Sequence, residues 1–421
     1  MSATTPICCS CGRGGLEFIL SLGRIPLANA LLSPDQLNQP ETAYPLDLAF
    51  CPNCSLVQIL ETVPPEKLFR DYLYFSSFSD TMVDHARTLV RELIFQHGLD
   101  ARCLVVEAAS NDGYLLRFYK EAGIPVLGID PAVKVAQAAR TRYGIETIAE
   151  FFTAALARRL RDEVGRAKVF HAHNVLGHVP DLNGFVAGTR LLLADDGLAI
   201  IEAPYVKDLI EKCEFDTIYH EHRCYFSLTA LCRLFTRHGL QVQDAKRITI
   251  HGGSLRLTVV HAATGHASSP QTEALLREEQ AWGVDQPAFY LRLTRRVEKV
   301  KASLCQFLGE LKRRGKRLAA YGAAAKGSIL LNYCGIGRDL LDFVVDRSTI
   351  KQGRYMPGVR LPIHAPEKLL EALPDYVLLL TWNFADEILR QQAEYVCRGG
   401  RFIRPIPEVQ VIPAPAAARA A

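Results

Sequence analysis

No stretch of the sequence is apolar over the roughly 18 residues that a membrane-spanning helix needs, so no transmembrane segment is expected. The formal net charge is only +4, and the densest basic run, residues 312–317, is typical of a solvated helix end rather than of a nucleic-acid surface. The first residues contain no basic segment followed by an apolar one, which argues against secretion. We therefore expect a cytoplasmic protein that binds neither membranes nor nucleic acid.

The dinucleotide fingerprint G-x-G-x-x-G is missing as well, which disfavours a nicotinamide oxidoreductase. What the chain does have is ample material for folded domains, since its 421 residues are 49% hydrophobic and 22% charged and predict two or three domains. Its twelve cysteines, without an export signal, are expected to be thiols and metal ligands in a reducing compartment.

Two C-x2-C pairs occur near the N-terminus, Cys8 with Cys11 and Cys51 with Cys54. Thiolates at this spacing on a tight turn reach the same ion, and two such pairs complete the closed tetrahedral set typical of structural zinc. Cys9 is then a spare thiol. A redox role for either pair is the alternative, although neither precedes a helix in the thioredoxin pattern. The segment between the pairs is loop-rich, so its thin core is expected to need the metal.

The chain is organised around residues 105–114, Val-Val-Glu-Ala-Ala-Ser-Asn-Asp-Gly-Tyr. An apolar run at residues 103–106 predicts a buried parallel strand, and a helix follows the turn at Gly113. A strand, tight turn and helix in this order place an adenosine-type ligand at the carboxyl edge of a sheet. The acid Glu107 leads and one glycine closes the loop, the order expected where the aminoacyl part of S-adenosylmethionine is cradled. A packed strand–turn–helix without a ligand is the alternative.

Further strands end in polar residues that suit the same edge. Asp130 closes a second apolar strand, where a carboxylate can accept two hydrogen bonds from a ribose diol or can cap the helix that Pro131 opens. Asn174 follows a third strand that begins at Lys168, and residues 197–205 supply a fourth. Strands that alternate with helical patterns predict a doubly wound α/β domain.

The most polar cluster lies at residues 215–227 and contains Tyr219, His220, Glu221 and His222. It predicts an acid–base centre, because imidazole takes a proton near neutral pH and an adjacent carboxylate can fix its tautomer. A polar surface turn is the alternative. A metal site is disfavoured, since the H-x-H pair has no third ligand nearby.

Two other segments are expected to border this centre. His178 follows the strand end at Asn174, where a substrate would lie next to a donor in the crevice between Glu107 and Asp130; a purely structural histidine is the alternative. Residues 71–80 form a linker rich in aromatic and hydroxyl side chains, which predicts burial against another domain or a ligand before a helix over residues 82–97.

The C-terminal part repeats the α/β pattern on a smaller scale. Residues 317–328 predict a strand, a turn of small residues and a helix, where backbone amides and Lys326 could meet an anion. Strands at residues 342–346, 376–383 and 400–403 complete this unit. This unit is expected to bind a nucleotide or diphosphate. The alternative is that it only packs against the first domain and stabilises it.

These residues, in order over nearly the whole chain, resemble the three-domain C-methyltransferases that act on nucleotide-linked deoxysugars. The motifs that carry the resemblance are the paired cysteine knuckles, Pro26-Leu-Ala-Asn29, Tyr74-Phe-Ser-Ser, Glu107-x-x-Ser-Asn-Asp-Gly113-Tyr-Leu-Leu, Gly128-Ile-Asp-Pro131, Asn174-Val-Leu-x-His178-Val, Glu202-x-Pro-Tyr205, Thr217-Ile-Tyr219-His-Glu-His222 with Tyr225-Phe-Ser227, His251-Gly-Gly-Ser-Leu-Arg256, and Tyr321-Gly-Ala-Ala-Ala-Lys-Gly327.

The resemblance implies a zinc-binding domain at residues 1–70, a Rossmann-like class I methyltransferase domain at residues 71–245, and a smaller α/β domain at residues 246–421 that helps to hold the sugar nucleotide. The residues expected around S-adenosylmethionine are Glu107, Ala109, Ser110, Asn111, Gly113, Tyr114, Asp130 and Asn174. Ala109 replaces the family's usual glycine, so its methyl group is expected to crowd the donor and lower its affinity.

The resemblance further implies that His222 is the catalytic base, with Tyr219 and Glu221 beside it and with His178 and Tyr74 lining the sugar pocket. The expected substrate is a 4-keto-deoxysugar linked to a nucleotide, usually thymidine diphosphate, methylated at C-3. His222 would remove the C–H proton, and the enolate would attack the donor's methyl group without help from the zinc ion. The alternatives are an O- or N-methyltransferase of the same fold and a non-catalytic zinc-ribbon scaffold. The oligomeric state is left open, a monomer being one option.

Overall fold

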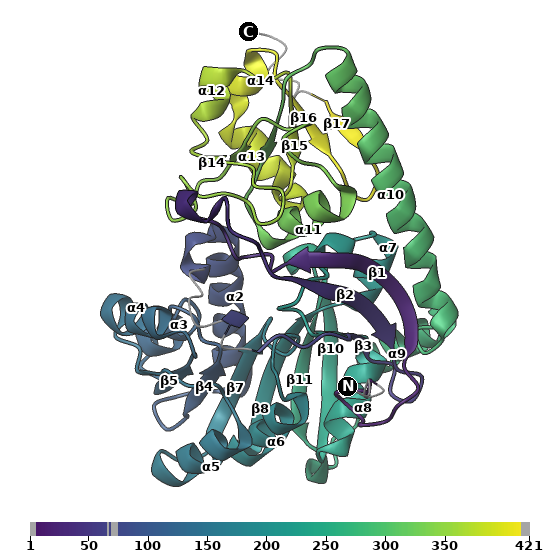
Figure 1. Ribbon diagram of the computed structural model, residues 1–421. Helices are drawn as coiled ribbons and strands as arrows, with labels where there is room; N and C mark the ends of the chain where they lie inside the picture. Colours follow the sequence, from purple (N-terminus) through teal and green to yellow (C-terminus); the bar gives the residue numbers. More distant parts are fainter. Residues whose placement is uncertain (1–5, 65–66, 69–74, 414–421) are drawn as a thin grey trace.

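The computed structural model describes residues 6–64, 67–68 and 75–413. Three β-sheets organise this part of the chain, and Figure 1 shows the N-terminal strands β1 and β2 between the central sheet and the C-terminal domain. Along the described ranges, no helix is both long and apolar enough to cross a bilayer.

The N-terminal sheet is antiparallel and has the order β1-β2-β3-β9. Its strands are β1 (Glu17–Pro26), β2 (Ala43–Phe50), β3 (Val57–Ile59) and β9 (Cys224–Tyr225). The last strand comes from the polar cluster of the central domain, and Val57 pairs with Tyr225. The zinc-binding region is therefore joined by backbone hydrogen bonds to the segment that carries His222.

The central sheet has the order β10-β11-β8-β7-β4-β5-β6. Its strands are β4 (Val105–Ala108), β5 (Val126–Ile129), β6 (Thr147–Ile148), β7 (Ala167–His173), β8 (Leu193–Pro204), β10 (Leu240–Ile248) and β11 (Ser254–His261). Strands β4 to β8 pair in parallel, whereas β11 runs antiparallel to both β8 and β10. The predicted doubly wound α/β domain is confirmed.

The strand predicted at residues 103–106 begins two residues later, at Val105. Cys103 still closes a turn, because its N–H donates to the Asp100 carbonyl oxygen over 3.0 Å. Glu107 therefore lies inside β4 rather than after it.

The helices of the central domain connect these strands. They are α2 (Asp80–His97), α3 (Leu116–Glu121), α4 (Val133–Tyr143), α5 (Ala154–Glu163), α6 (Leu182–Leu192), α7 (Val206–Glu211) and α8 (Leu228–Arg237). The predicted helix at residues 82–97 is α2, whose first turn is capped by the Ser79 hydroxyl and whose end is the left-handed Gly98. Its apolar face, which includes Leu89 and Val90, packs in the core beside β4.

The domain boundary expected at residue 245 falls inside β10. Strand β11 and helix α9 (Pro270–Trp282) follow that position and still pack on the central domain. The buried Glu279 of α9 accepts hydrogen bonds from the Tyr205 hydroxyl and from the amides that begin α8, at Leu228 and Thr229, over 2.7–2.8 Å.

The C-terminal domain begins after the long helix α10 (Pro287–Arg313). Its sheet has the order β14-β13-β12-β15-β16-β17 and is parallel except at β17. The strands are β12 (Leu318–Tyr321), β13 (Val344–Val345), β14 (Ile363–His364), β15 (Tyr376–Leu379), β16 (Arg401–Arg404) and β17 (Gln410–Ile412). The helices are α11 (Ala325–Cys334), α12 (Lys368–Ala372), α13 (Ala385–Gln391) and α14 (Ala393–Cys397).

One apolar core runs through the N-terminal sheet, α7, α10 and the C-terminal sheet, and includes Leu48, Leu209, Leu293 and Ile329. Polar contacts reinforce it, since the Ser328 hydroxyl of α11 donates to the Ala28 carbonyl oxygen over 2.8 Å. The three regions therefore hold one another in place around the polar cluster.

Candidate functional site

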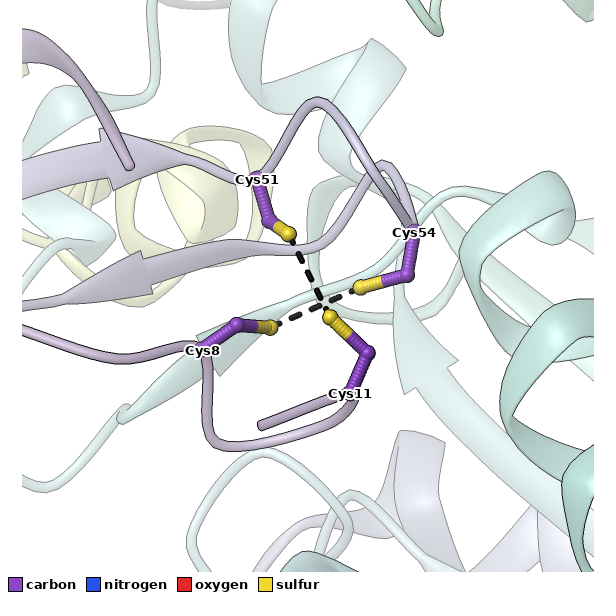
Figure 2. Close-up of side chains that lie close together, drawn as sticks. All are labelled: Cys8, Cys11, Cys51 and Cys54. Carbon is purple, nitrogen blue, oxygen red and sulfur yellow. Dashed lines mark hydrogen bonds between the residues drawn. The ribbon is translucent and has the colours of Figure 1, made fainter. Parts of the chain in front are cut away.

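The four predicted zinc ligands lie together, with all four sulfur atoms within 4.8 Å of one another. The Sγ atoms of Cys8 and Cys54 are 3.5 Å apart, and those of Cys11 and Cys51 are 3.6 Å apart. The lines that join the two pairs cross in Figure 2. Zn–S bonds of ~2.3 Å in a tetrahedron place sulfur atoms about 3.8 Å apart, so the donor set fits a closed zinc site. No other group of this kind occurs among the described residues.

Local turns account for this geometry. In the first pair the Gly12 N–H donates to the Cys8 carbonyl oxygen, and in the second the Ser55 N–H donates to that of Cys51, each over 2.8 Å. Both turns need a residue with positive φ, 72° at Gly12 and 61° at Ser55. Cys9 is outside the set of four and lies 3.3 Å, sulfur to sulfur, from Cys224.

The loop between β4 and α3 has the backbone conformation of a tight cradle. Positive φ values occur at Ala109 (56°), Asn111 (51°) and Gly113 (80°). A Cβ atom on Gly113 would lie 3.0 Å from Ile145 Cγ1, so the one glycine of the loop is needed for both conformation and space. Ala109 adopts the left-handed region at a cost of about 1 kcal/mol. That its methyl group crowds the donor stays a prediction.

Glu107 is fully buried, and neither of its carboxylate oxygens has a partner among the described residues. Burial, and then the charges of Asp130, Asp112 and Glu202, raise the pKa of this carboxyl well above its usual value. The Ser110 hydroxyl and the Asn174 side-chain oxygen likewise lack partners in the described part of the chain. Buried polar atoms left in this way suit a cationic, polar ligand, and the ammonium and sulfonium groups of S-adenosylmethionine have that character.

Asp130 closes the other side of the loop. Its two carboxylate oxygens accept hydrogen bonds from the Asn111 and Ala132 amides over 3.0 and 2.9 Å, and burial raises its pKa to about 6. Helix α4 begins at Val133 with Ala132 as its N-cap, so Asp130 is not the capping residue that the sequence offered as an alternative. Contact with a ribose stays a prediction.

The linker that precedes α2 packs against the same loop. The Ser76 N–H donates to the Asn111 side-chain oxygen over 2.8 Å, and the Ser77 hydroxyl donates to Asp112. Over residues 75–79 the linker is at most half-buried and Phe78 is exposed, so these residues contact the loop without the burial against another domain or a ligand that the sequence predicted, and Tyr74 lies outside the described residues. Tyr114, 5% exposed, packs in the core beside α2.

The buried carboxyl group at the end of β4 leads to a binding prediction. We expect Glu107→Gln to raise the dissociation constant of S-adenosylmethionine about 10- to 100-fold, because a neutral amide loses a charged hydrogen bond. Isothermal titration should be run with S-adenosylmethionine and S-adenosylhomocysteine. An equal loss of affinity for the two ligands would indicate that Glu107 contacts the ammonium group, which both contain. A larger loss for S-adenosylmethionine would indicate that it contacts the sulfonium. The matched control is the exposed Glu121→Gln on α3, and an unchanged constant in Glu107→Gln would remove Glu107 from the site.

The polar cluster brings aromatic rings together around the half-buried His222. The ring centroids of Tyr219 and His178 lie 4.0 and 4.6 Å from that of His222, and Tyr225 is 6.3 Å away. The Nδ1 atom of His222 is 2.9 Å from the Thr217 carbonyl oxygen. A carbonyl oxygen only accepts, so Nδ1 carries the hydrogen and, in the neutral ring, Nε2 keeps its lone pair.

The neighbouring histidine and carboxylate serve other contacts. His220 is buried, with Nε2 3.1 Å from the Pro45 carbonyl oxygen of β2, so it anchors the N-terminal sheet. Glu221 accepts a hydrogen bond from the Asn29 side chain over 2.7 Å, and burial raises its pKa to about 7. The backbone carbonyl of Thr217, rather than an adjacent carboxylate, thus fixes the tautomer of His222.

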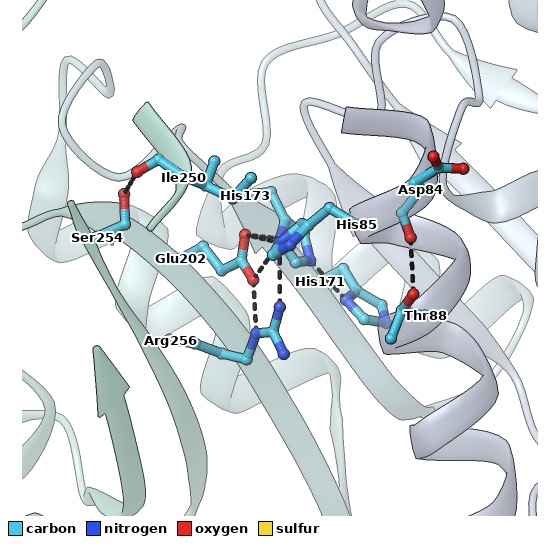
Figure 3. A network of polar contacts seen from close by, with 9 residues as sticks. All are labelled: Asp84, His85, Thr88, His171, His173, Glu202, Ile250, Ser254 and Arg256. Atoms are coloured by element: carbon cyan, nitrogen blue, oxygen red, sulfur yellow. Dashed lines mark hydrogen bonds and ion pairs between the residues drawn. The ribbon is translucent and has the colours of Figure 1, made fainter. Parts of the chain in front are cut away.

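A buried polar network at the ends of β7 and β8 was not predicted as part of the site. Figure 3 shows Glu202 between Arg256 of β11, His85 of α2 and His173 of β7, at 2.6, 2.9 and 3.0 Å. His171 continues the chain, with Nδ1 2.8 Å from His173 Nε2. The sequence did contain a signal that could have identified Glu202 as a site residue. It is an acid near the end of an apolar strand, like Glu107. Its charge contributes to the raised pKa of Glu107.

Three protein-family models match successive parts of the chain. A zinc binding domain matches residues 8–69, a methyltransferase domain residues 84–245, and the C-methyltransferase C-terminal domain residues 249–407. The C-methyltransferase NovU of Streptomyces niveus is 39% identical over 407 residues, which cover 97% of each chain.

Solved structures give more distant likenesses. Magnesium protoporphyrin IX methyltransferase of Synechocystis PCC 6803 is 16% identical, with a TM-score of 0.36 over 48% of this chain and 98% of its own. A SAM-dependent methyltransferase of Anabaena variabilis is 14% identical, with a TM-score of 0.35 over 42% of this chain and 84% of its own.

The fold, the donor loop and the four-thiolate site define a zinc-binding, S-adenosylmethionine-dependent methyltransferase with a class I central sheet. The chain belongs to the C-methyltransferase family that includes NovU. This family membership favours methyl transfer to carbon over the two alternatives, an O- or N-methyltransferase and a scaffold without activity.

Proposed function

We propose that the protein methylates a nucleotide-linked 4-keto-deoxysugar at C-3, the carbon next to the ketone, with His222 as the base. The observation that carries the proposal is the hydrogen bond from His222 Nδ1 to the Thr217 carbonyl oxygen, which leaves Nε2 as a proton acceptor at the polar cluster. The substrate class, and thymidine diphosphate as its nucleotide, follow from the resemblance in sequence motifs.

The chemistry needs a base because a C–H bond is not nucleophilic by itself. His222 Nε2 takes the proton from the carbon next to the ketone, and the resulting imidazolium keeps its hydrogen bond to Thr217. In this proposal the hydroxyl of Tyr219 donates to the enolate oxygen, and the nearness of its ring, whose centroid is 4.0 Å from that of His222, supports this role. Bound S-adenosylmethionine supplies the methyl group to the enolate carbon.

Glu221 and His178 complete the proposed sugar pocket. Because burial raises the pKa of Glu221 to about 7, a large share of its carboxyl groups are protonated near neutral pH and can donate a hydrogen bond to a sugar oxygen. The nucleotide would extend toward the C-terminal domain, where Lys326 lies in the first turn of α11 with its Nζ 3.1 Å from the Asn383 side-chain oxygen.

The test is a panel of nucleotide-linked keto-deoxysugars incubated with the enzyme and S-adenosylmethionine. We expect one compound to gain the mass of one methyl group in place of hydrogen, with the new signal assigned to C-3 by NMR. Without the donor, the same compound in deuterium oxide should exchange the hydrogen at that carbon. A panel in which no 4-keto sugar is methylated or exchanged would contradict the proposed substrate class.

A further inference from the structure

A single indole joins the C-terminal domain to the segment that carries the base. The residue is Trp382, in the short turn η6 (Trp382–Phe384), and its Nε1–H donates to the Asp216 Oδ2 atom over 2.7 Å. Asp216 is fully buried in the turn η3 (Phe215–Thr217) of the central domain. Burial raises the pKa of its carboxyl to about 6, so Asp216 is ionised at neutral pH and the bond is charge-assisted.

The next residue in η3 supplies the acceptor for the base. Thr217 follows Asp216 directly, and its carbonyl oxygen accepts the hydrogen bond from His222 Nδ1 over 2.9 Å. The position of that oxygen depends on how η3 is held. A shift of it would let the imidazole turn or adopt the other tautomer, with the hydrogen on Nε2, which cannot take a proton.

Other contacts from the C-terminal domain hold η3 and the indole. The ring of Phe215, also in η3, lies edge-on to that of Tyr333 of α11 with centroids 5.4 Å apart. The Lys326 ammonium sits 4.7 Å from the Trp382 ring centroid, and its Nζ is 3.1 Å from the neighbouring Asn383 side-chain oxygen. The indole is thus fixed on one side by its own domain while its N–H reaches the other.

We propose that Trp382 is a positioning residue, whose hydrogen bond to Asp216 fixes the Thr217 carbonyl oxygen and thereby holds His222 in the Nδ1–H tautomer. The proposal rests on the proposed role of His222 for its effect on turnover. Its effect on the tautomer is independent of that role. The C-terminal domain accordingly helps to determine which ring nitrogen of His222 carries the hydrogen.

The tautomer is measured directly by long-range ¹H–¹⁵N spectra of the full-length, zinc-loaded protein, with the His222 signals assigned from their loss in His222→Asn. We expect the wild type to show the Nδ1–H form and Trp382→Phe to show a mixture with the Nε2–H form. Trp282→Phe is the matched control, because Trp282 is the other tryptophan of the chain and stacks with Lys207 instead. It should leave the His222 signals unchanged.

The second readout is steady-state kinetics with the keto-deoxysugar that the enzyme methylates. We expect kcat to fall about 10-fold in Trp382→Phe with the KM for S-adenosylmethionine unchanged, since a small misplacement of a catalytic group is costly. Asp216→Ala should cause a similar loss, and the double variant should lose no more than either, because both remove the same link. Unchanged binding of S-adenosylmethionine shows that each variant is folded.

The outcomes separate the two proposals. A tautomer and kcat equal to wild type in both single variants would overturn the role of Trp382. Additive losses in the double variant would overturn it as well. A changed tautomer with an unchanged kcat would support the positioning link and contradict His222 as the base.

Discussion

Replacing His222 with asparagine should lower kcat by a factor of about 10² to 10⁴ while the dissociation constant for S-adenosylmethionine stays at the wild-type value. Asparagine retains a side-chain N–H for the Thr217 carbonyl oxygen but has no basic nitrogen. Steady-state kinetics and isothermal titration check the two parts. Deuterium exchange at the substrate carbon should disappear in parallel with kcat, because both depend on the same proton transfer.

His220→Asn is the matched control for this variant. His220 is two residues away and equally an imidazole, but its Nε2 lies against the Pro45 carbonyl oxygen of β2. Its replacement should lower the melting temperature and leave kcat within a few-fold of wild type. Turnover that survives in His222→Asn, or that is lost equally in both variants, would remove His222 from the role of base.

Loss of the metal should abolish turnover although the proposed mechanism gives the zinc ion no chemical step. We expect Cys54→Ser to purify with little zinc and with a destabilised N-terminal domain, because a structural zinc site contributes about 10–16 kcal/mol to the folding of small domains. The second cysteine pair leads directly into β3, which pairs with β9 two residues after His222. Metal analysis, thermal unfolding and kcat measure the three effects.

Cys9→Ser separates this effect from the simple loss of a thiol. Cys9 neighbours the zinc ligand Cys8 but contacts Cys224 instead of the four-sulfur cluster, so the variant should keep its zinc and most of its activity. Zinc content equal to wild type in Cys54→Ser would contradict the ligand assignment. Full turnover of a zinc-depleted protein would contradict the link through β3 and β9.

Features that depend on interactions between residues close in sequence were predicted more accurately than features that depend on residues far apart. The tight turn between β4 and α3 was predicted correctly because an acid, short polar residues and one glycine at fixed spacing determine a turn locally, and Gly113 does adopt a positive φ. The start of β4 was placed two residues early, because Cys103 and Leu104 are as apolar as the strand that follows although Cys103 still closes the turn at Asp100. The polar cluster was located, but which partner fixes its histidine was not.

Long-range contacts gave no comparable signal. Asn29 and Glu221, which share a hydrogen bond of 2.7 Å, are 192 residues apart, and Trp382 and Asp216 are 166 residues apart. The expected adjacency of Glu221 to the base came from sequence proximity. In the structure Glu221 accepts from the N-terminal region, whereas a backbone carbonyl holds His222.

The sequence by itself determined the clustering of the four cysteines, the tight turn that closes at Gly113 and the alternation of strands and helices, because residue spacing on turns and strands sets these features within a few positions. Only the tertiary structure decided which nitrogen of His222 meets the Thr217 carbonyl oxygen and which of two histidines faces the rings of Tyr219 and His178. Those properties depend on hydrogen bonds between elements that meet only when the three regions pack around a shared core.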